Sequence, residues 1–383
     1  MSLPTLLTFA KVSRETRILV HTFIRQMYDI ELQLQEFFTP LEASMFRLLQ
    51  RNSGLLISGS FALRFFSGQN FGPESDMDIY VEDRYEPRVL DWLCSIGYVC
   101  TKRAASYQDR NIAALRMRQR VLFGDRAPNL GGGYVRGMAA NNIGRMAGNQ
   151  GRRAAHNIGP NLRGMGHNRQ PNNLRGIGPN LRRVYNMERR GRKIQLIVTH
   201  GSSVGIILEY HSTCVMNIIS HDHAYCLYPK ATLLQKRSLV IYRPGFAEHH
   251  SQDALDKYRR RGWTMVVSPE REDYALSTSA FRIGNRHIGD NLCWTIPLGR
   301  PSTASDDLIE ANSWTLCQSE LRLGRLLHAH RSLRLESLRF SYVANARTKH
   351  QANLLFGRKR SYGEEPLCFK DRDFRRLVEM LNE

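Results

Sequence analysis

The sequence predicts an α/β fold of the α+β kind, in which helices flank a mixed sheet. Three observations lead to this expectation. Apolar and polar residues alternate over 76–82, and a period of two is typical of a half-buried strand. A short apolar run at 55–57 ends at a Gly-Ser pair and leads into a helical pattern. Helical and strand patterns then succeed one another up to residue 100, an order that indicates an α+β core.

Each element of the N-terminal part has its own local signal. Residues 15–37 carry apolar side chains near the 3.6-residue period of an amphipathic helix. Thr39 before Pro40 is typical of an N-cap followed by proline at the first helical position, so a second helix is expected from there to a break at 52–54. After the strand, a further helix is expected over 61–66, and a glycine ends it.

The later elements follow from the same periodicities. The remaining expected helices cover residues 89–96, 203–210, 232–242, 253–261 and 374–381, and the remaining expected strands cover 98–100, 193–198, 264–267 and 292–296. Beyond residue 299 the periodicity weakens. The sequence therefore divides into a helical N-terminal lead at 1–54, a core at 55–125 and 188–245, an insertion at 126–187, and a C-terminal region at 246–383 of uncertain fold.

Composition limits the class of protein. The 55 lysines and arginines exceed the 35 acidic residues and give a formal net charge of +20, which favours polyanionic partners such as nucleotides or nucleic acid. A hydrophobic content of 42% argues against wholesale disorder. No apolar run approaches the ~18 residues of a membrane helix, so no membrane partner is expected. The first residues lack a signal-peptide pattern, although the basic stretch 8–26 leaves a transit peptide open.

The seven cysteines show no CxxC spacing and indicate reduced thiols rather than a disulfide framework. We therefore expect an intracellular protein, cytoplasmic or nuclear. His221, Asp222, His223 and Cys226 have the residue types of a zinc site, but no second cluster completes four ligands, so a polar loop is expected.

The insertion at 126–187 has a composition of its own. It holds ten arginines, no lysine and no acidic residue, is rich in glycine and asparagine, and repeats itself, since NIGPNLRG at 157–164 recurs as GIGPNLRR at 176–183. Such a segment buries too little apolar surface to offset chain entropy, so disorder is predicted. Its Arg-Gly dipeptides are typical of segments that bind RNA. The alternative is an expanded repeat without a selected role.

Residues 55–82 carry the pattern with the most chemical content. Gly59 and Ser60, at a strand-to-helix turn, offer backbone N–H groups and a hydroxyl to a phosphate. Asp76 and Asp78 lie two apart on a strand, so their side chains share one face and are able to hold a divalent cation together. Hard oxygen ligands favour Mg²⁺ or Mn²⁺ bound with a nucleoside triphosphate (NTP).

This stretch, LLISGSFALRFFSGQNFGPESDMDIYVE, resembles the nucleotidyltransferase fold of the DNA polymerase β superfamily, whose signature is a Gly-Gly or Gly-Ser pair followed by Asp-x-Asp or Asp-x-Glu. It is most similar to uncharacterised nucleotidyltransferase-like proteins of fungi. The phrases HSTCVMNIIS at 211–220 and AYCLYPKATLLQKRSLVIY at 224–242 add to the likeness, which covers 40–242 without the insertion.

The resemblance implies transfer of a nucleoside monophosphate from a Mg²⁺-bound NTP to an acceptor hydroxyl. By the same resemblance, Gly59 and Ser60 would contact the phosphates, and Asp76 and Asp78 would be the catalytic, metal-binding carboxylates. The gap between the Gly-Ser pair and the aspartates is longer than the superfamily usually shows, so a longer loop is expected between them.

The superfamily's third carboxylate has no match. The corresponding strand is 193–198, and Gln195 stands at that position, where a neutral amide cannot act as a general base. Glu74 and Glu82 are expected to be surface charges. Glu209 on the next helix is expected to be a charge on the helix face, and the alternative is that it substitutes for the missing carboxylate. Three functions remain open: a nucleotidyltransferase, a degenerate nucleotide- or RNA-binding protein of the same fold, and a structural protein that uses neither site.

Overall fold

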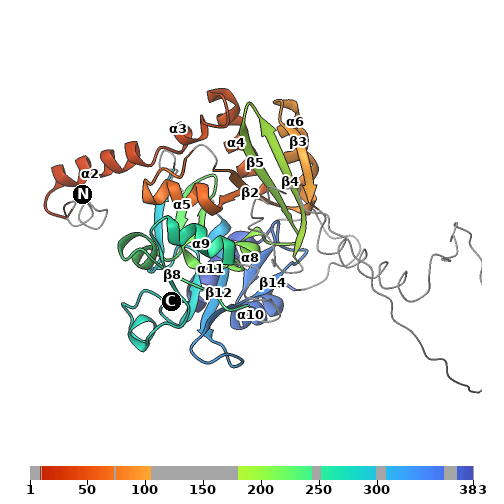
Figure 1. Ribbon diagram of the computed structural model, residues 1–383. Helices are drawn as coiled ribbons and strands as arrows, with labels where there is room; N and C mark the ends of the chain where they lie inside the picture. The colour runs from red at the N-terminus through yellow and green to blue at the C-terminus, as the bar shows by residue number, and fades with distance from the viewer. Residues whose placement is uncertain are drawn as a thin grey trace, which may run out of the picture. The chain divides into compact units, whose positions relative to one another are not determined.

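The computed structural model describes residues 9, 11–72, 75–104, 180–243, 252–298, 308–357 and 369–382 (Figure 1). All of them belong to one structural unit of the chain. Most of the predicted insertion, residues 126–179, lies outside the described residues, as does Glu74. In the described part of the chain, no helix is both long enough and apolar enough to cross a membrane.

A mixed eight-stranded sheet forms the centre, in the order β11-β7-β6-β1-β2-β5-β4-β3. Its strands are β1 Leu56–Ser58, β2 Met77–Glu82, β3 Val99–Ala104, β4 Leu181–Arg189, β5 Arg192–Thr199, β6 Asn217–Ile219, β7 His223–Cys226 and β11 Trp294–Pro297. β2 and β5 are parallel, and the other neighbours in this sheet are antiparallel. Helices surround the sheet, which confirms the α+β fold class.

The helices are α2 Arg14–Met27, α3 Ile30–Leu34, α4 Pro40–Ser53, α5 Gly59–Ser67, α6 Glu86–Ser95, α8 Ser203–Leu208, α9 Gln252–Arg260, α10 Ala346–Phe356 and α11 Asp371–Asn382. Short helical turns are η1 Asp83–Tyr85, η2 Thr213–Val215, η3 Lys230–Leu234, η5 Arg271–Asp273 and η6 Leu308–Ala311. α4 begins at the predicted N-cap, where Thr39 and Glu42 form a reciprocal capping box.

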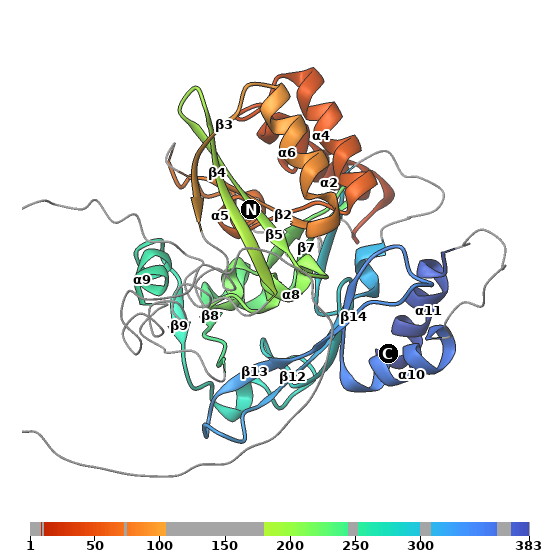
Figure 2. The ribbon, with the colours of Figure 1, turned by 90° about the vertical axis from the view of Figure 1, so that its right-hand side faces the viewer.

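Alternation along the strands separates two hydrophobic cores. In β2, Ile79 and Val81 belong to the core on one face, whereas Tyr80 belongs to the core on the other. α4 and α6 cover the first face side by side (Figure 2), and the rings of Phe46 and Trp92 meet there at 5.9 Å. Asp78 and Tyr80 are two residues apart on β2, so their side chains share one face of the sheet. This is the face on which α8 packs, opposite the one that α4 and α6 cover.

The C-terminal region extends this second face. It adds a sheet of β10 Gly284–His287, β12 Ser313–Gln318 and β13 Leu326–Ala329, and a pair of β14 Arg331–Leu333 and β15 Tyr342–Ala344. It also supplies β9 Thr264–Val266, which pairs in parallel with β8 Arg237–Leu239 of the core. Trp314 and Leu316 of β12 enter the same core as Tyr80. A third cluster joins Tyr342 to Phe374 of α11.

Three sequence expectations are corrected. The helix expected over 232–242 is instead the turn η3 followed by β8, because Lys236 has a positive φ of 51° and β8 pairs with β9. The single helix expected over 15–37 is interrupted where Asp29 caps a separate α3.

The predicted C-terminal boundary of the insertion is also corrected. Its predicted end at 187 is wrong, because residues 181–189 form β4, which pairs with β5 through buried Val184 and Met187. The strand expected over 292–296, in the C-terminal region of uncertain fold, is β11, which completes one edge of the central sheet by pairing with β7.

Candidate nucleotide site

The turn from β1 into α5 brings Gly59 of the Gly-Ser pair close to the carboxylate of Asp78. Gly59 has φ +68°, a left-handed conformation that glycine adopts without strain. A β-carbon at this position would lie 2.1 Å from Asp78 Oδ2, which is far inside contact distance. Glycine is therefore required here both by its φ and by the carboxylate that occupies the space of a side chain.

Pairing between strands fixes the partners of Asp78. In the antiparallel pair β1–β2 it lies opposite Ser58, and in the parallel pair β2–β5 it lies opposite Gln195. Gln195 shares its face, because the flanking Ile194 and Leu196 enter the core on the other side. The structure thus brings the Gly-Ser turn, Asp78 and the doubtful third position into adjacent places on one face of the sheet.

Ser60 and Asp76 lie at the edge of this arrangement. Ser60 is buried in the first turn of α5, and its Oγ lies 3.0 Å from Ser75 Oγ, so the hydroxyl bridges the helix and the residue just before the aspartates. Asp76 is half-buried beside the start of β2. Between the end of α5 at Ser67 and the start of β2 at Met77, the described residues 68–72, 75 and 76 belong to no helix or strand.

The pKa of Asp78 is set by its burial and by two neighbouring charges. Burial raises the pKa of Asp78 to about 7, the negative charge of Asp76 adds to this, and the positive charge of Lys257 opposes it. A raised pKa means that the ionised carboxylate is poorly compensated by the protein alone. A cation beside the pair would relieve that cost.

Lys257 is the member of the site that sequence reasoning missed. It lies on α9, where burial and the neighbouring Arg261 lower its pKa, while Asp78 and Asp76 raise it. Its ammonium therefore interacts with both aspartates. The only signal in the sequence was a basic run at the end of an expected helix, which is ordinarily a solvated surface.

Arg261, one helical turn further on, supports the loop before the aspartates. Its guanidinium lies 4.1 Å from the ring centroid of Phe71 and 5.4 Å from that of Tyr258. Its Nη1 atom is buried and has no hydrogen-bond partner among the residues that the structure describes. A buried guanidinium nitrogen of this kind is a donor available to an anion.

Buried aromatic residues lie near Asp78. Tyr80 and Tyr210 meet edge to face at 6.2 Å, and burial raises the pKa of Tyr210 well above its ordinary value, with a further contribution from Asp78. His211, 5.5 Å from Tyr258, has its pKa lowered to about 3 by burial and by the nearby cations, so it is neutral at neutral pH. Neither group supplies positive charge to the aspartates.

The donor set fits a hard divalent cation with few protein ligands. Asp76 and Asp78 offer carboxylate oxygens, and Gln195 offers a neutral amide oxygen. Within the described residues, no group of three or more His, Cys, Asp or Glu side chains is placed to hold a metal ion. Glu209, at the end of α8, therefore does not complete a three-carboxylate group with the two aspartates.

The His221–Cys226 stretch spans a turn between two strands. The imidazole Nε2 of His221 lies 3.2 Å from Asp222 Oδ2, and Cys226 is fully buried in β7, where burial raises its pKa. The stretch leads into β7, which lies three strands away from β2 in the order of the sheet.

No family model, no curated protein and no solved structure matches the chain. The site is therefore interpreted from its own geometry: a strand-to-helix glycine turn, two carboxylates on one strand face, and two basic side chains from α9 and the residue that follows it.

Proposed function

We propose that this chain is a nucleotidyltransferase-like protein that binds an NTP with Mg²⁺ or Mn²⁺ and transfers its nucleoside monophosphate to an acceptor hydroxyl. The observation that supports this most directly is the contact between the Gly59 backbone and the Asp78 carboxylate. It puts the N–H groups of a strand-to-helix turn beside a carboxylate that is able to hold a metal ion, which is the juxtaposition that a metal-bound triphosphate requires.

Each residue has a role in this proposal. The backbone at Gly59 and the hydroxyl of Ser60 contact phosphate oxygens, while Lys257 and Arg261 place positive charge across from them. Asp76 and Asp78 would hold the divalent ion, which when bound supplies charge neutralisation on the reacting phosphate. The raised pKa of Asp78 supports this assignment, because it reports negative charge that the protein leaves uncompensated.

The alternative is a nucleotide- or RNA-binding protein of the same fold without transfer activity. Gln195 favours it, because this amide occupies the place directly opposite Asp78 and has no basic group with which to deprotonate an acceptor. The variant Gln195→Asp distinguishes the two. A gain in NMP transfer from radiolabelled NTP indicates a weakened enzyme, and unchanged transfer with retained NTP binding indicates the binding role.

Thermal stability tests the site without a known acceptor. The midpoint of unfolding is measured with each NTP, with and without Mg²⁺, because a ligand at 100 times its Kd stabilises the native state by about 2.7 kcal/mol. We expect an NTP-dependent rise that requires Mg²⁺ and disappears in Asp76→Ala/Asp78→Ala. Asp91→Ala is the matched control, since Asp91 is exposed on α6 at the other face of the sheet. No rise with any NTP would refute the proposal.

RNA remains a proposed second partner through the Arg-rich insertion, which lies outside the described residues apart from its last few. Deletion of 126–179 tests it. Loss of RNA binding with unchanged NTP-dependent stabilisation would assign the two ligands to separate parts of the chain. An intracellular location, cytoplasmic or nuclear, likewise remains a prediction.

A further inference from the structure

A cavity of about 480 Å³ lies at the end of the sheet opposite the two aspartates. Glu82, the last residue of β2, and Ser202, just beyond β5, line it, so it opens at the carboxyl ends of the two parallel strands. Glu82 lies four positions further along β2 than Asp78, which amounts to about 13 Å. Carboxyl ends of parallel strands are favoured positions for ligands in open sheets, and the volume is that of a small-molecule pocket.

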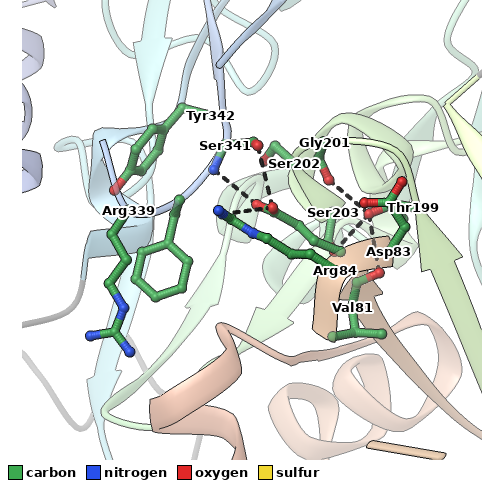
Figure 3. A network of polar contacts seen from close by, with 12 residues as sticks. Val81, Asp83, Arg84, Thr199, Gly201, Ser202, Ser203, Arg339, Ser341 and Tyr342 are labelled. Atoms are coloured by element: carbon green, nitrogen blue, oxygen red, sulfur yellow. Dashed lines mark hydrogen bonds and ion pairs between the residues drawn. The ribbon is translucent and has the colours of Figure 1, made fainter. Parts of the chain in front are cut away.

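The wall of the cavity is held by Glu82, which the structure buries although a surface charge was expected. Its Oε1 accepts a hydrogen bond from Ser341 N at 2.9 Å, its Oε2 accepts one from Ser341 Oγ at 3.3 Å, and Arg84 Nη2 lies 2.8 Å from Oε2 (Figure 3). The expectation failed because the residues that cover Glu82 lie more than 250 positions away in the sequence.

A second buried carboxylate holds the same segment from the other side. Asp371, the first residue of α11, accepts hydrogen bonds from Arg339 N at 2.8 Å, Phe340 N at 3.2 Å and Tyr342 Oη at 2.5 Å. The segment 339–342 is thus fixed between two carboxylates that use its backbone and hydroxyl groups. Its side chains at the cavity are therefore preorganised, which lowers the entropic cost of binding a ligand.

Basic and apolar side chains line the cavity alongside neutral polar ones such as Gln50 and Asn52. Arg51 of α4, Arg339 from the segment between β14 and β15, and Arg372 of α11 line it, together with apolar Leu56 and Ile309. Among the described residues, no ion pair joins Arg51 or Arg339 to a carboxylate.

The side chain of Arg339 is held in place by contacts with neutral groups. Its Nη2 atom donates to the Asn52 carbonyl at 3.3 Å, and its guanidinium lies 5.1 Å from the ring centroid of Phe340. In Figure 3 its side chain extends away from the contacts that Ser341 makes. The carboxylates of Glu82 and Asp371 thus accept hydrogen bonds from protein donors, whereas the guanidinium groups of Arg51 and Arg339 have no carboxylate partner among the described residues.

We propose that this cavity is a second ligand site, distinct from the nucleotide site, which binds a small organic anion: an apolar body against Leu56, Ile309 and Phe340, and a phosphate or carboxylate head group held by Arg51 and Arg339. Such an anion joins α4 of the N-terminal lead to the C-terminal region, since Arg51 and Arg339 come from these two parts. Arg–phosphate and Arg–carboxylate hydrogen bonds are among the strongest that proteins make to ligands.

Isothermal titration calorimetry on the full chain tests the proposal with two probes, AMP for an aromatic phosphate and decanoate for an acyl carboxylate. Adenosine and decanol are their uncharged counterparts. We expect one of the two anions to bind with a stoichiometry of one and its counterpart at least tenfold more weakly. The variant Arg51→Gln/Arg339→Gln should weaken binding of that anion about tenfold or more. Arg322→Gln, an exposed arginine outside the cavity, should leave it unchanged.

The variant Asp76→Asn/Asp78→Asn separates this proposal from the proposed nucleotide function. Retained affinity in that variant supports a separate site, whether or not NTP binding is found. Affinity lost in that variant would place the anion at the nucleotide site and overturn the proposal. Binding of neither anion, or equal affinity in the Arg51→Gln/Arg339→Gln variant, would overturn it as well.

Discussion

Replacement of Gly59 by alanine is the sharpest perturbation of the candidate site. The added β-carbon would lie 2.1 Å from Asp78 Oδ2, and its residue would have to keep φ at +68°. A non-glycine residue in the left-handed region costs about 1 kcal/mol. Overpacking against the Asp78 carboxylate adds about 1–3 kcal/mol. We therefore expect Gly59→Ala to lower the free energy of unfolding by about 2–4 kcal/mol.

Gly68, at the other end of α5, supplies the matched control. Its φ of +64° is nearly the same, but the nearest atom to an added β-carbon is Met27 Cε at 3.9 Å, an ordinary contact. Gly68→Ala therefore carries the backbone cost alone, about 1 kcal/mol. The difference between the two variants isolates the contact with the carboxylate.

Urea denaturation followed by tryptophan fluorescence measures both free energies of unfolding, and Mg²⁺-dependent stabilisation by NTP measures the site. The double variant Gly59→Ala/Asp78→Ala should recover the part of the loss that comes from the clash, because the carboxylate is gone. Equal losses in Gly59→Ala and Gly68→Ala, or no recovery in the double variant, would refute the close contact on which the site is built.

Three further predictions concern charge. The raised pKa of Asp78 means that the protein without metal loses stability as the pH rises from about 4 to about 7. Asp78→Asn should therefore be more stable than the native protein above pH 7, by a few kcal/mol in thermal melts. Equal stability of the two proteins would contradict this. Lys257→Met should move the midpoint of that loss to higher pH, since the ammonium lowers the pKa of Asp78. Arg189 lowers the pKa of Glu42 to about 2, so stability from this pair is present above pH 4.5 and is lost as the pH falls through 2; in Arg189→Met this acid-dependent loss should be smaller.

The local elements of the candidate site were accessible to sequence reasoning. The strand at 76–82 follows from its alternation, and the α4 N-cap follows from Thr39 and Pro40. The strand-to-helix turn follows from the Gly-Ser pair after an apolar run. In each case the signal is a period or a residue type whose physical effect extends over only a few positions.

Other features were missed because their causes are distant in sequence. Lys257 interacts with aspartates about 180 positions earlier, and no local pattern marks it. The residues of β8 were expected to form a helix, because the apolar residues there fit the period of a helix as well as that of a strand. Pairing with β9 makes them a strand. Residues 181–187 were included in the insertion because their composition is basic, and pairing with β5 makes them a strand.

The sequence by itself determined the α+β class, the period of the strands, and which residues of β2 turn toward each face. Those properties depend on the alternation of side chains and on the conformations open to glycine and proline. Only the tertiary structure decided that the Asp78 carboxylate lies against Gly59, that a lysine faces it, and that Glu82 is buried under Ser341. The physical reason is that burial and charge compensation depend on segments that meet in space, and chain folding brings those segments together from opposite ends of the sequence.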